Sequence, residues 1–496
     1  ADKLLVGFAK TGLLHPGEQE TVTVSFPCAS LASYDEKKSA WVLERGEYGI
    51  YVGKSSRELQ PEAALVLERT VVTEQCRPLF RGEKADQLFP KHSAGVSYFC
   101  PTILIDSESI PSVTHTYTGT PTALSAPTRR VSFSDVTSGK ATASELAGQL
   151  TPEELALLCI GAARVSFTDF SVIGNASKSI PGAAGDTTDR LEGYGIPQCA
   201  MADGPAGIRV NPKVYQRGDT YINNVEEDPI LGKVLPPELR KVDLSGTEIK
   251  YQYCTALPVA VQLAQSWNPK LAELAGDIAG AEMEELGIDL WLAPGLNIQR
   301  NPLCGRNFEY YSEDPYLSGI FAAAVTRGVQ KHPGKGTCIK HLAANNQETC
   351  RSTSNSHVSE RALREIYLRG FEICVKDSRP FSAMTSMNLL NGVHTANDQD
   401  LLTHALRDEW GFDGIVMTDW GTTGQFVSVG EARKYGPSTP VGCILAGNDL
   451  IMPGTKFDED TLFAAIRDGS LPVAALQDCG KRLIQLLVKC TSGRKG

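Results

Sequence analysis

The chain has 496 residues, of which 42% are hydrophobic and 21% are charged, and its formal net charge at pH 7 is -10. This composition is ordinary for a soluble globular protein and argues against a disordered chain or a fibrous repeat. Because nucleic acids and anionic membranes are bound through basic patches, the acidic balance disfavours both as partners. The length exceeds that of one small domain, and a barrel of about 250 to 400 residues with an accessory module would account for it.

The 13 cysteines are scattered along the chain, and no two of them have the C-x-x-C spacing of a zinc ribbon or a redox motif. An odd count leaves at least one thiol unpaired. Cysteines in apolar surroundings, such as Cys338 and Cys443, behave as small buried hydrophobes in a reducing compartment. The sequence contains no apolar run of about 18 residues, which a membrane-spanning helix requires. We therefore expect a cytoplasmic protein without nucleic-acid or membrane partners.

Residues 1–75 have the patterns of β-strands. Apolar and polar residues alternate over residues 21–26 and again over residues 48–52, and turn-forming residues separate such runs. These strands amount to a partial β-sandwich. Over residues 76–142 the alternation weakens and proline, serine and threonine accumulate, which predicts a long linker along a domain surface.

From residue 143 onward, helices of about 10 to 20 residues alternate with short apolar strands, the pattern of βα units around a parallel sheet. The clearest helix covers residues 269–287. The residues predicted to share its buried face are Leu271, Leu274, Ile278 and Met283. Strands are expected over residues 288–294, 336–339, 382–385, 414–418 and 449–452. We assign residues 143–496 to an α/β fold, a (β/α)8 barrel of the TIM type.

The most informative local feature is Asp419, which directly follows the apolar run over residues 414–417 and precedes Trp420. In parallel α/β barrels the loops after the strands build the active site, so a carboxylate at the end of a strand is a candidate for chemistry. The alternative is a solvated aspartate that caps the next turn. Other polar residues at predicted strand ends decide between the two.

Charged and aromatic residues recur where the predicted strands finish. A sugar offers a ring of hydroxyls that carboxylates accept from and that Arg, Lys and His donate to, while an aromatic ring can stack on its apolar face. The set therefore suits a pyranose. Its members are Asp203, Arg306, Lys340, His341, Asp419 and Trp420.

A structural interpretation exists for each residue taken alone. Asp203 would cap the turn that follows it, and Arg306 would pair with Glu309 or Glu313. The lysine and the histidine would form a solvated strand end. The occurrence of all of them together favours a binding site.

The motifs that carry these residues resemble those of glycoside hydrolase family 3, and the β-glucosidase branch is the most similar. The resemblance covers roughly residues 143–496. The motifs occur in family order and are ADGPAG (202–207), GLNI (295–298), GRNFE (305–309), SEDP (312–315), KH (340–341) and TDWG (418–421).

This resemblance implies an exo-acting retaining β-glycosidase that releases terminal non-reducing β-D-glucosyl residues from small β-glucosides or oligosaccharides. It implies that Asp419 attacks the anomeric carbon and forms a covalent glycosyl intermediate, while a second group about 5 to 5.5 Å away acts as acid and then as base. The sugar-binding role falls to Asp203, Arg306, Lys340 and His341. Neither a metal nor a cofactor is expected. A β-xylosidase or β-N-acetylglucosaminidase of the same family is an alternative.

Met387 departs from the family pattern, because relatives commonly have a tyrosine there whose hydroxyl reaches toward the nucleophile. Methionine cannot donate that hydrogen bond. Met387 either makes the pocket more deformable and shifts the sugar preference, or it packs against Leu389 as part of the core.

The second departure concerns the acid/base. The β-glucosidase branch usually draws this glutamate from a separate α/β sandwich domain, which we do not find before the chain ends at Gly496. Residues 1–75 resemble the later strands of a fibronectin type III-like domain, which here precedes the barrel, as in circularly permuted members of the family. We therefore expect a second chain or a missing segment to supply the α/β sandwich.

Two further alternatives follow from a missing acid/base. His357 is the one nearby residue in the barrel that could replace the glutamate, because KH at 340–341 lacks the second histidine of the N-acetylglucosaminidase loop. A chain that binds sugar without this group would instead be a carbohydrate-binding or sensor protein. The presence of Asp419 argues against that function.

Overall fold

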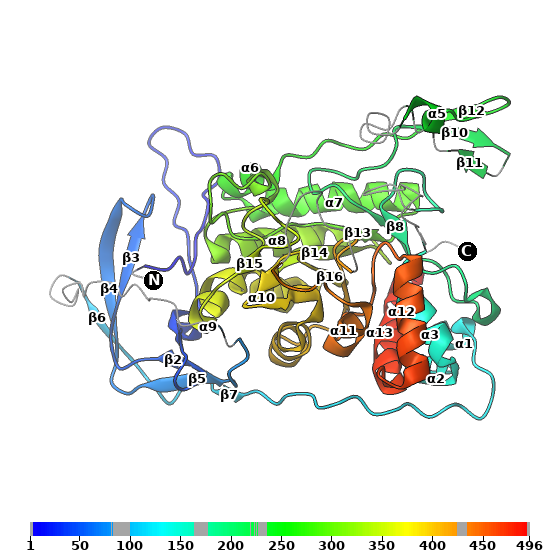
Figure 1. Ribbon diagram of the computed structural model, residues 1–496. Helices are drawn as coiled ribbons and strands as arrows, with labels where there is room; N and C mark the ends of the chain where they lie inside the picture. Colours follow the sequence, from blue (N-terminus) through cyan, green and yellow to red (C-terminus); the bar gives the residue numbers. More distant parts are fainter. Residues whose placement is uncertain are drawn as a thin grey trace.

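The structure is a computed structural model that describes residues 3–80, 82, 100–162, 177–218, 220–222, 224, 226, 236–423 and 434–493. It contains an α/β barrel surrounded by helices, with two small β-sheets of the N-terminal region at one side and a three-stranded arm at the other (Figure 1). The arm consists of β10 (Lys213–Arg217), β11 (Thr220–Ile222) and β12 (Glu248–Tyr251).

The barrel is built on a six-stranded sheet with the order β19-β16-β14-β13-β9-β8. Single parallel bridges extend it from Met417 to Leu450 and from Ile451 to Ile160. The amide of Ala162 then donates to the carbonyl of Asp186 in β8 over 2.9 Å, which closes the ring. The named strands are β8 (Gly185–Asp186), β9 (Ala200–Ala202), β13 (Leu290–Trp291), β14 (Gly336–Leu342), β16 (Ser382–Thr385) and β19 (Ile415–Met417).

This architecture is of the predicted TIM-barrel type, with one difference. Strand β8 runs antiparallel to β9, whereas β9, β13, β14, β16 and β19 are mutually parallel. Only the short 3₁₀ segment η2 (Glu192–Tyr194) lies between β8 and β9 in the described chain. A parallel neighbour needs a crossover that is usually an α-helix, and the return over residues 187–199 contains none, which fits the antiparallel pair.

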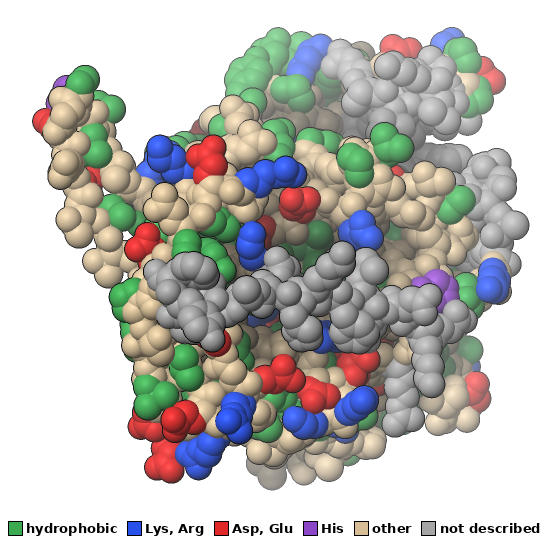
Figure 2. Space-filling view, turned by 90° about the vertical axis from the view of Figure 1, so that its left-hand side faces the viewer, with side chains coloured by type: hydrophobic (Ala, Val, Ile, Leu, Met, Phe, Trp, Pro, Cys, Tyr) green, Lys and Arg blue, Asp and Glu red, His purple; other side chains and the backbone are tan. Residues whose placement is uncertain are grey.

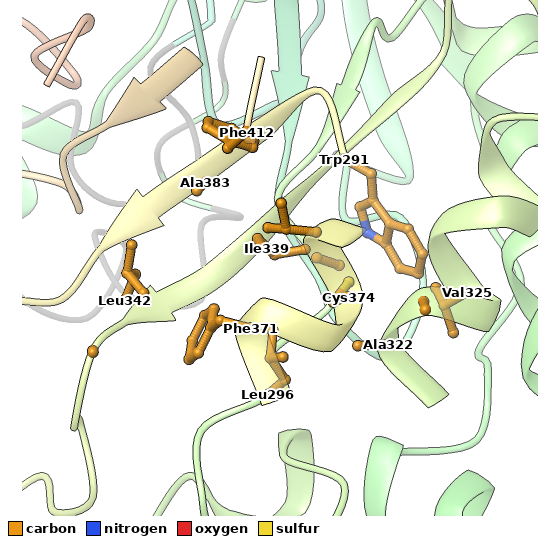
Figure 3. Close-up of a cluster of buried hydrophobic side chains, with 14 of the residues drawn as sticks. Trp291, Leu296, Ala322, Val325, Ile339, Leu342, Phe371, Cys374, Ala383 and Phe412 are labelled. Atoms are coloured by element: carbon orange, nitrogen blue, oxygen red, sulfur yellow. The ribbon is translucent and has the colours of Figure 1, made fainter. Parts of the chain in front are cut away.

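Side chains along each strand alternate between the barrel interior and the surrounding helices, as the two-residue period of a strand requires. The outward residues pack on helices in one core cluster, which Figure 3 shows around Trp291, Ile339 and Ala383. The alternate residues belong to a second cluster: Met201, Leu290, Leu292, Cys338, Met384, Ile415 and Met417. The inward positions therefore have a fixed parity in sequence, which also places the polar residues at the strand ends.

The helices of the barrel layer lie between its strands in sequence. They are α6 (Ala260–Gln265), α7 (Pro269–Leu286), α8 (Pro315–Val329), α9 (Glu360–Ala362), α10 (Arg369–Ser378) and α11 (Pro440–Ala446), with the π-helical segments η5 (Leu363–Tyr367) and η7 (Asp400–Glu409). Five more pack beside the last strand positions: α1 (Phe133–Thr137), α2 (Ala143–Gln149), α3 (Pro152–Leu158), α12 (Lys456–Asp468) and α13 (Val473–Thr491). Helices α7, α8, α9 and α11 begin with a side-chain cap, and Gly287 in the left-handed conformation ends the longest of the helices between strands.

The extent predicted for helix α7 is confirmed, and of its predicted buried face Met283 is buried and Ile278 packs partly against the core, but Leu271 and Leu274 were placed wrongly. Leu271 and Leu274 are 45% and 52% exposed. The buried stripe consists instead of small residues: Ala272, Ala275, Gly276, Ala279 and Gly280, together with Met283. A Cβ at Gly276 would lie 2.1 Å from the Val325 carbonyl of α8, so the two helices approach too closely for a leucine. Close helix packing thus selected Ala and Gly over the larger apolar residues.

The N-terminal region forms two sheets that share one small core. Their strands are β1 (Ser33–Asp35), β2 (Ala40–Leu43), β5 (Val71–Gln75) and β7 (Val113–Thr114) in one sheet, and β3 (Gly46–Gly53), β4 (Leu59–Leu67) and β6 (Thr102–Ile105) in the other. The strand predicted over residues 48–52 lies in β3. Strands β6 and β7 belong to the segment 76–142, so the sheets continue past the predicted boundary at residue 75.

The strand predicted over residues 21–26 is wrong. That stretch has no regular structure, and residues 9–25 are all exposed. Alternation gives a strand only where another strand supplies hydrogen bonds and a core covers one face. Before this loop, Phe8 packs edge-on against Trp267 and Tyr316 of the barrel.

A buried ionic network joins the N-terminal region to the barrel. Arg364 of η5 is 3% exposed and holds both carboxylate oxygens of Glu409, at 2.6 and 3.0 Å. Its Nε donates to Glu360 over 2.9 Å, and Glu360 also accepts from the Tyr34 hydroxyl and the Leu79 amide. Because every carboxylate in it has several donors, the network fixes the two parts against each other.

Figure 2 shows the face of the molecule on the side of the N-terminal sheets. Among the described residues there, basic side chains are mixed with acidic ones and form no continuous basic patch. No helix in the described part of the chain is both long and apolar enough to cross a membrane.

Candidate active site

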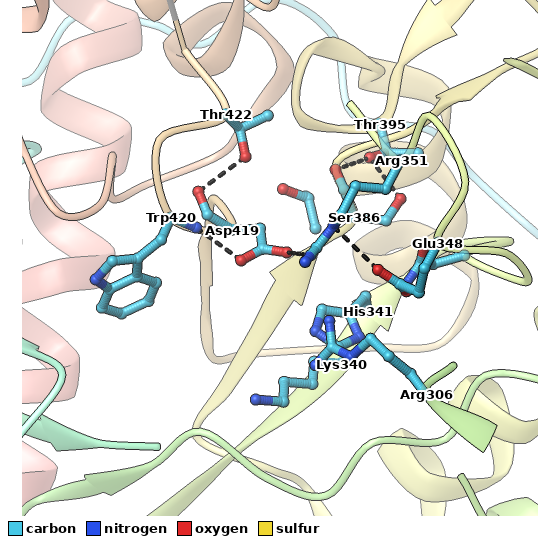
Figure 4. A network of polar contacts seen from close by, with 12 residues as sticks. Arg306, Lys340, His341, Glu348, Arg351, Ser386, Thr395, Asp419, Trp420 and Thr422 are labelled. Carbon is cyan, nitrogen blue, oxygen red and sulfur yellow. Dashed lines mark hydrogen bonds and ion pairs between the residues drawn. The ribbon is translucent and has the colours of Figure 1, made fainter. Parts of the chain in front are cut away.

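Asp419 lies two residues beyond the inward-facing Met417 of β19, at the carboxyl end of the barrel, and its side chain is 13% exposed. One carboxylate oxygen, Oδ1, accepts from the backbone amide of Trp420 over 2.7 Å. The other, Oδ2, accepts from Nη2 of Arg351 over 3.1 Å (Figure 4). Both oxygens therefore have a donor, and the carboxylate is oriented within the site.

Asp203 and Lys340 occupy equivalent inward positions, two residues beyond Met201 and Cys338. Lys340 is 3% exposed, and its Nζ donates to Asp203 Oδ1 over 2.6 Å. The interpretation of Lys340 as a solvated strand end is therefore wrong. Arg209 contacts the second oxygen of Asp203 over 2.8 Å. Burial works to raise the pKa of Asp203, but the two cations outweigh it and hold this pKa at about 2.

Arg306 forms an ion pair with Glu309, which is one of the two partners that the structural interpretation offered. It precedes the 3₁₀ turn η4 (Asn307–Glu309) and is 21% exposed. Burial works to lower the pKa of the guanidinium, but Tyr310, Glu309 and Asp419 raise it. Arg306 therefore stays cationic and faces the nucleophile candidate.

His341 is almost completely buried, at 1% exposure. Its amide donates to Asn297 over 2.7 Å, and its Nδ1 lies 3.2 Å from the Tyr310 hydroxyl. Burial, together with Arg306, Lys340 and Arg351, holds the pKa of His341 well below its usual range. This imidazole is therefore neutral and can exchange hydrogen bonds with a neutral ligand.

The neutral state of His341 makes the stability of the fold depend on pH. An unfolded histidine takes up a proton below about pH 6.5, whereas folded His341 does not, so the free energy of unfolding falls as the pH drops below that value. We expect His341→Gln to remove up to about 1.4 kcal/mol per pH unit from this decline. Urea unfolding at pH 7, 6 and 5 measures it, with the exposed His15→Gln as control. Equal slopes for the parent and His341→Gln would refute the assignment.

Trp420 and Met387 take positions at the edge of this group. The indole of Trp420 lies on the other side of Asp419 from Arg351, donates to the Ala184 carbonyl over 3.3 Å and packs partly against the core. Met387 follows β16 and is partly exposed between the buried residues Ser386 and Asn388. His357, the alternative proton donor, is held by Asn355 at 3.1 Å on an exposed loop.

Sequence reasoning missed two residues of the site, Arg351 and Glu348. Both lie in the loop after β14, and Glu348 Oε2 is 3.3 Å from Arg351 Nε. The signal available was the polar run over residues 345–351, shortly after β14, the strand that contains Lys340 and His341. That run was considered only for a second histidine, so its charged residues were overlooked.

The described residues contain no group of three or more His, Cys, Asp and Glu that could hold a metal ion. Two open depressions of about 470 and 410 Å³ lie at the amino-terminal end of the strands, away from this site. The second is lined by residues such as Ala200 and Asp289, at or just before the starts of β9 and β13.

Comparisons with known proteins agree with this geometry. The sequence model of the glycosyl hydrolase family 3 N terminal domain matches residues 232–486, and that of the fibronectin type III-like domain matches residues 1–56. Asp203 lies upstream of the first span, whereas the other predicted site residues lie within it.

Curated relatives and solved structures extend the similarity to nearly the whole chain. The chain is 34% identical to β-glucosidase A of Butyrivibrio fibrisolvens over 93% of its length and 50% of that protein. It is 33% identical to a β-glucosidase of Ruminococcus albus, covering 98% of this chain and 47% of that one. A β-glucosidase structure from Paenibacillus barengoltzii matches 99% of this chain and 50% of that chain, with 34% identity and a TM-score of 0.77.

The chain thus spans about half the length of the curated relatives it matches. The expected family is confirmed by the matching model, the order of the motifs and the barrel that carries them. This protein belongs to glycosyl hydrolase family 3 and carries a fibronectin type III-like segment ahead of its barrel.

Proposed function

We propose that this protein is an exo-acting retaining β-glycosidase, and specifically a β-glucosidase, in which Asp419 attacks the anomeric carbon of a terminal glucosyl residue. The observation that carries the proposal is the position of Asp419 at the carboxyl end of β19, where Arg351 donates a hydrogen bond to its carboxylate. Two curated relatives carry the name β-glucosidase, and β-glucosidase 3B of Thermotoga neapolitana was solved with glucose, at 40% identity and a TM-score of 0.57 over 71% of this chain.

The site suits an uncharged sugar. Asp203 is ionised and accepts hydrogen bonds, Lys340 and Arg306 donate them, and neutral His341 can do either. Because Lys340 and Arg306 are already paired with carboxylates, the site has little excess positive charge to attract an anionic substrate. We infer that hydroxyl groups are its ligands.

We propose that the proton donor is a carboxyl group of an α/β sandwich domain, on a second chain or another part of the same protein. A general acid must hold its proton until the leaving group needs it. The described carboxylates around Asp419 are poor candidates, because each is already held by a cation in an ion pair. These pairs are Asp203 with Lys340, Glu309 with Arg306, and Glu348 with Arg351.

An activated substrate tests the proposal without this proton donor. The phenolate of a dinitrophenyl β-glucoside leaves without protonation, so the chain should release a burst of one phenolate per active site. Stopped-flow absorbance measures the burst. Binding of glucose without any burst would instead identify a carbohydrate-binding or sensor protein. We also propose a reducing compartment, the cytoplasm, as the place of action, because buried cysteines such as Cys338 and Cys443 form no disulfide.

Met387 gives the proposal a specificity test. If its thioether lines the pocket, Met387→Tyr adds a hydroxyl beside the nucleophile and changes the ratio of burst rates on dinitrophenyl glucoside and xyloside by about threefold or more. Met387→Leu, which keeps an apolar side chain of similar volume, serves as the matched control and should leave this ratio near the parent value. An unchanged ratio in Met387→Tyr would favour the role of Met387 as core packing.

A further inference from the structure

Arg351 is shared between two carboxylates. Its Nη2 donates to Asp419 Oδ2 over 3.1 Å, while its Nε lies 3.3 Å from Glu348 Oε2. Figure 4 shows the guanidinium between the two acids. The Glu348 side chain is 22% exposed, so it is largely removed from water and has a defined position. A single contact therefore joins Arg351 to Asp419, although a guanidinium can hold a carboxylate with two.

Glu348 is anchored from the other side by buried groups. Its Oε1 accepts from Asn345 Nδ2 over 3.2 Å, and the same amide nitrogen lies 3.1 Å from the Tyr310 hydroxyl. That hydroxyl contacts His341 Nδ1 over 3.2 Å. Asn345 and Tyr310 are 2% and 0% exposed. A continuous chain of polar contacts therefore runs from His341 through Glu348 to Arg351 and Asp419.

We propose that Glu348 is a positioning residue. It holds Arg351 so that the guanidinium makes a single contact with Asp419, and this leaves a lone pair of the Asp419 carboxylate free for attack. The inference rests on the proposed function of Asp419. Without the Glu348 carboxylate, the guanidinium can turn and bind both oxygens of Asp419, as Arg364 does with Glu409 elsewhere in the barrel. A nucleophile clamped in that way attacks more slowly.

Glu348 also completes the charge balance of the site. Among the described residues, the charged groups of the site come from strand β14 and from the loops after β9, β13, β14 and β19, while His341 beside them is neutral. In the described part of the site, four acids are balanced by four bases: Asp203, Glu309, Glu348 and Asp419, and Arg209, Arg306, Lys340 and Arg351. Removing one acid leaves one uncompensated cation beside the nucleophile, so we expect the pH profile of the burst to extend to lower pH.

The test uses the full chain and the burst from a dinitrophenyl β-glucoside. For Glu348→Gln we expect the burst rate constant to fall roughly tenfold, while the acid limb of its pH profile moves to lower pH. Glu348→Asp keeps the charge but has a shorter side chain, so its burst rate constant should fall while the acid limb of its pH profile stays in place. Glu273→Gln is the matched control, since Glu273 pairs with Arg327 and Lys331 outside the site.

A double-mutant cycle shows whether Glu348 acts through Arg351. We expect Glu348→Gln to have little further effect in an Arg351→Met background, because the group that it positions is gone. Additive effects, or a Glu348→Gln variant with the parent's rate and acid limb, would overturn the proposal. A parent chain that binds glucose without a burst would count against the proposed function instead. In that case the same double-mutant cycle is repeated on glucose affinity, measured by calorimetry. Coupled effects of the two substitutions on affinity would support the positioning role of Glu348, and additive effects would refute it.

Discussion

Asp419→Ala is expected to abolish the burst of phenolate from a dinitrophenyl β-glucoside while the protein stays folded. In the described site, Asp419 directly follows β19, and Arg351 holds its carboxylate. The carboxylate of Asp203 is instead held by the buried Lys340. Loss of a nucleophile typically costs a factor on the order of 10⁴ to 10⁶ in rate. Asp419 is at a strand end and 13% exposed, so its removal leaves the barrel core intact.

The control for this result is Asp413→Ala, because Asp413 lies just before the same strand and is exposed, where it pairs with Lys489. Asp413→Ala should release the burst of phenolate with the rate constant of the parent. Circular dichroism and the melting temperature of both variants establish that they fold. A burst of parental size from Asp419→Ala would show that the nucleophile is elsewhere.

Arg364→Ala is expected to lower the free energy of unfolding by about 3 to 5 kcal/mol, because it leaves the carboxylates of Glu360 and Glu409 buried without their cation. The same change weakens the attachment of the N-terminal sheets, since Tyr34 and Leu79 bond to Glu360. Urea unfolding measures the loss, and limited proteolysis measures the release of the N-terminal region.

A neighbouring arginine provides the matched control. Arg361 is 37% exposed and pairs with Glu365, so Arg361→Ala should cost no more than about 1 kcal/mol. Arg364→Lys keeps the charge but cannot make the two-pronged contact with Glu409, and it should fall between the two. Equal losses for Arg361→Ala and Arg364→Ala would contradict the role given to the buried network.

The barrel was predictable because its strands are short apolar runs that end in polar residues, and the positions of β14, β16 and β19 followed directly. The buried face of α7 could not be predicted, because the sequence of this helix contains both a leucine stripe and an alanine-glycine stripe. Hydrophobicity favours the first, and the close approach of α8 selects the second. Such a choice depends on the distance to a helix that is remote in sequence.

The site was predictable where a residue type follows a strand, as for Asp203, Lys340 and Asp419. The ion pair between Asp203 and Lys340 could not be predicted, because the two residues are separated by 137 positions in the sequence and by strand β13 in the sheet. The shared inward parity of the strands brings the two side chains together over the top of the barrel. Arg351 escaped prediction because it lies well beyond its strand, where loop geometry and not periodicity sets its direction.

If Asp419 is the nucleophile, it forms a covalent bond with the sugar, and a slow substrate should trap that bond. The full chain would be incubated with a dinitrophenyl 2-deoxy-2-fluoro-β-glucoside, digested with pepsin and mapped by mass spectrometry. We predict one fluoroglucosyl group per chain, on the peptide that contains Asp419 and on that side chain. A label on another carboxylate such as Asp203 or Glu348, or a chain that binds glucose but takes up no label, would contradict the account.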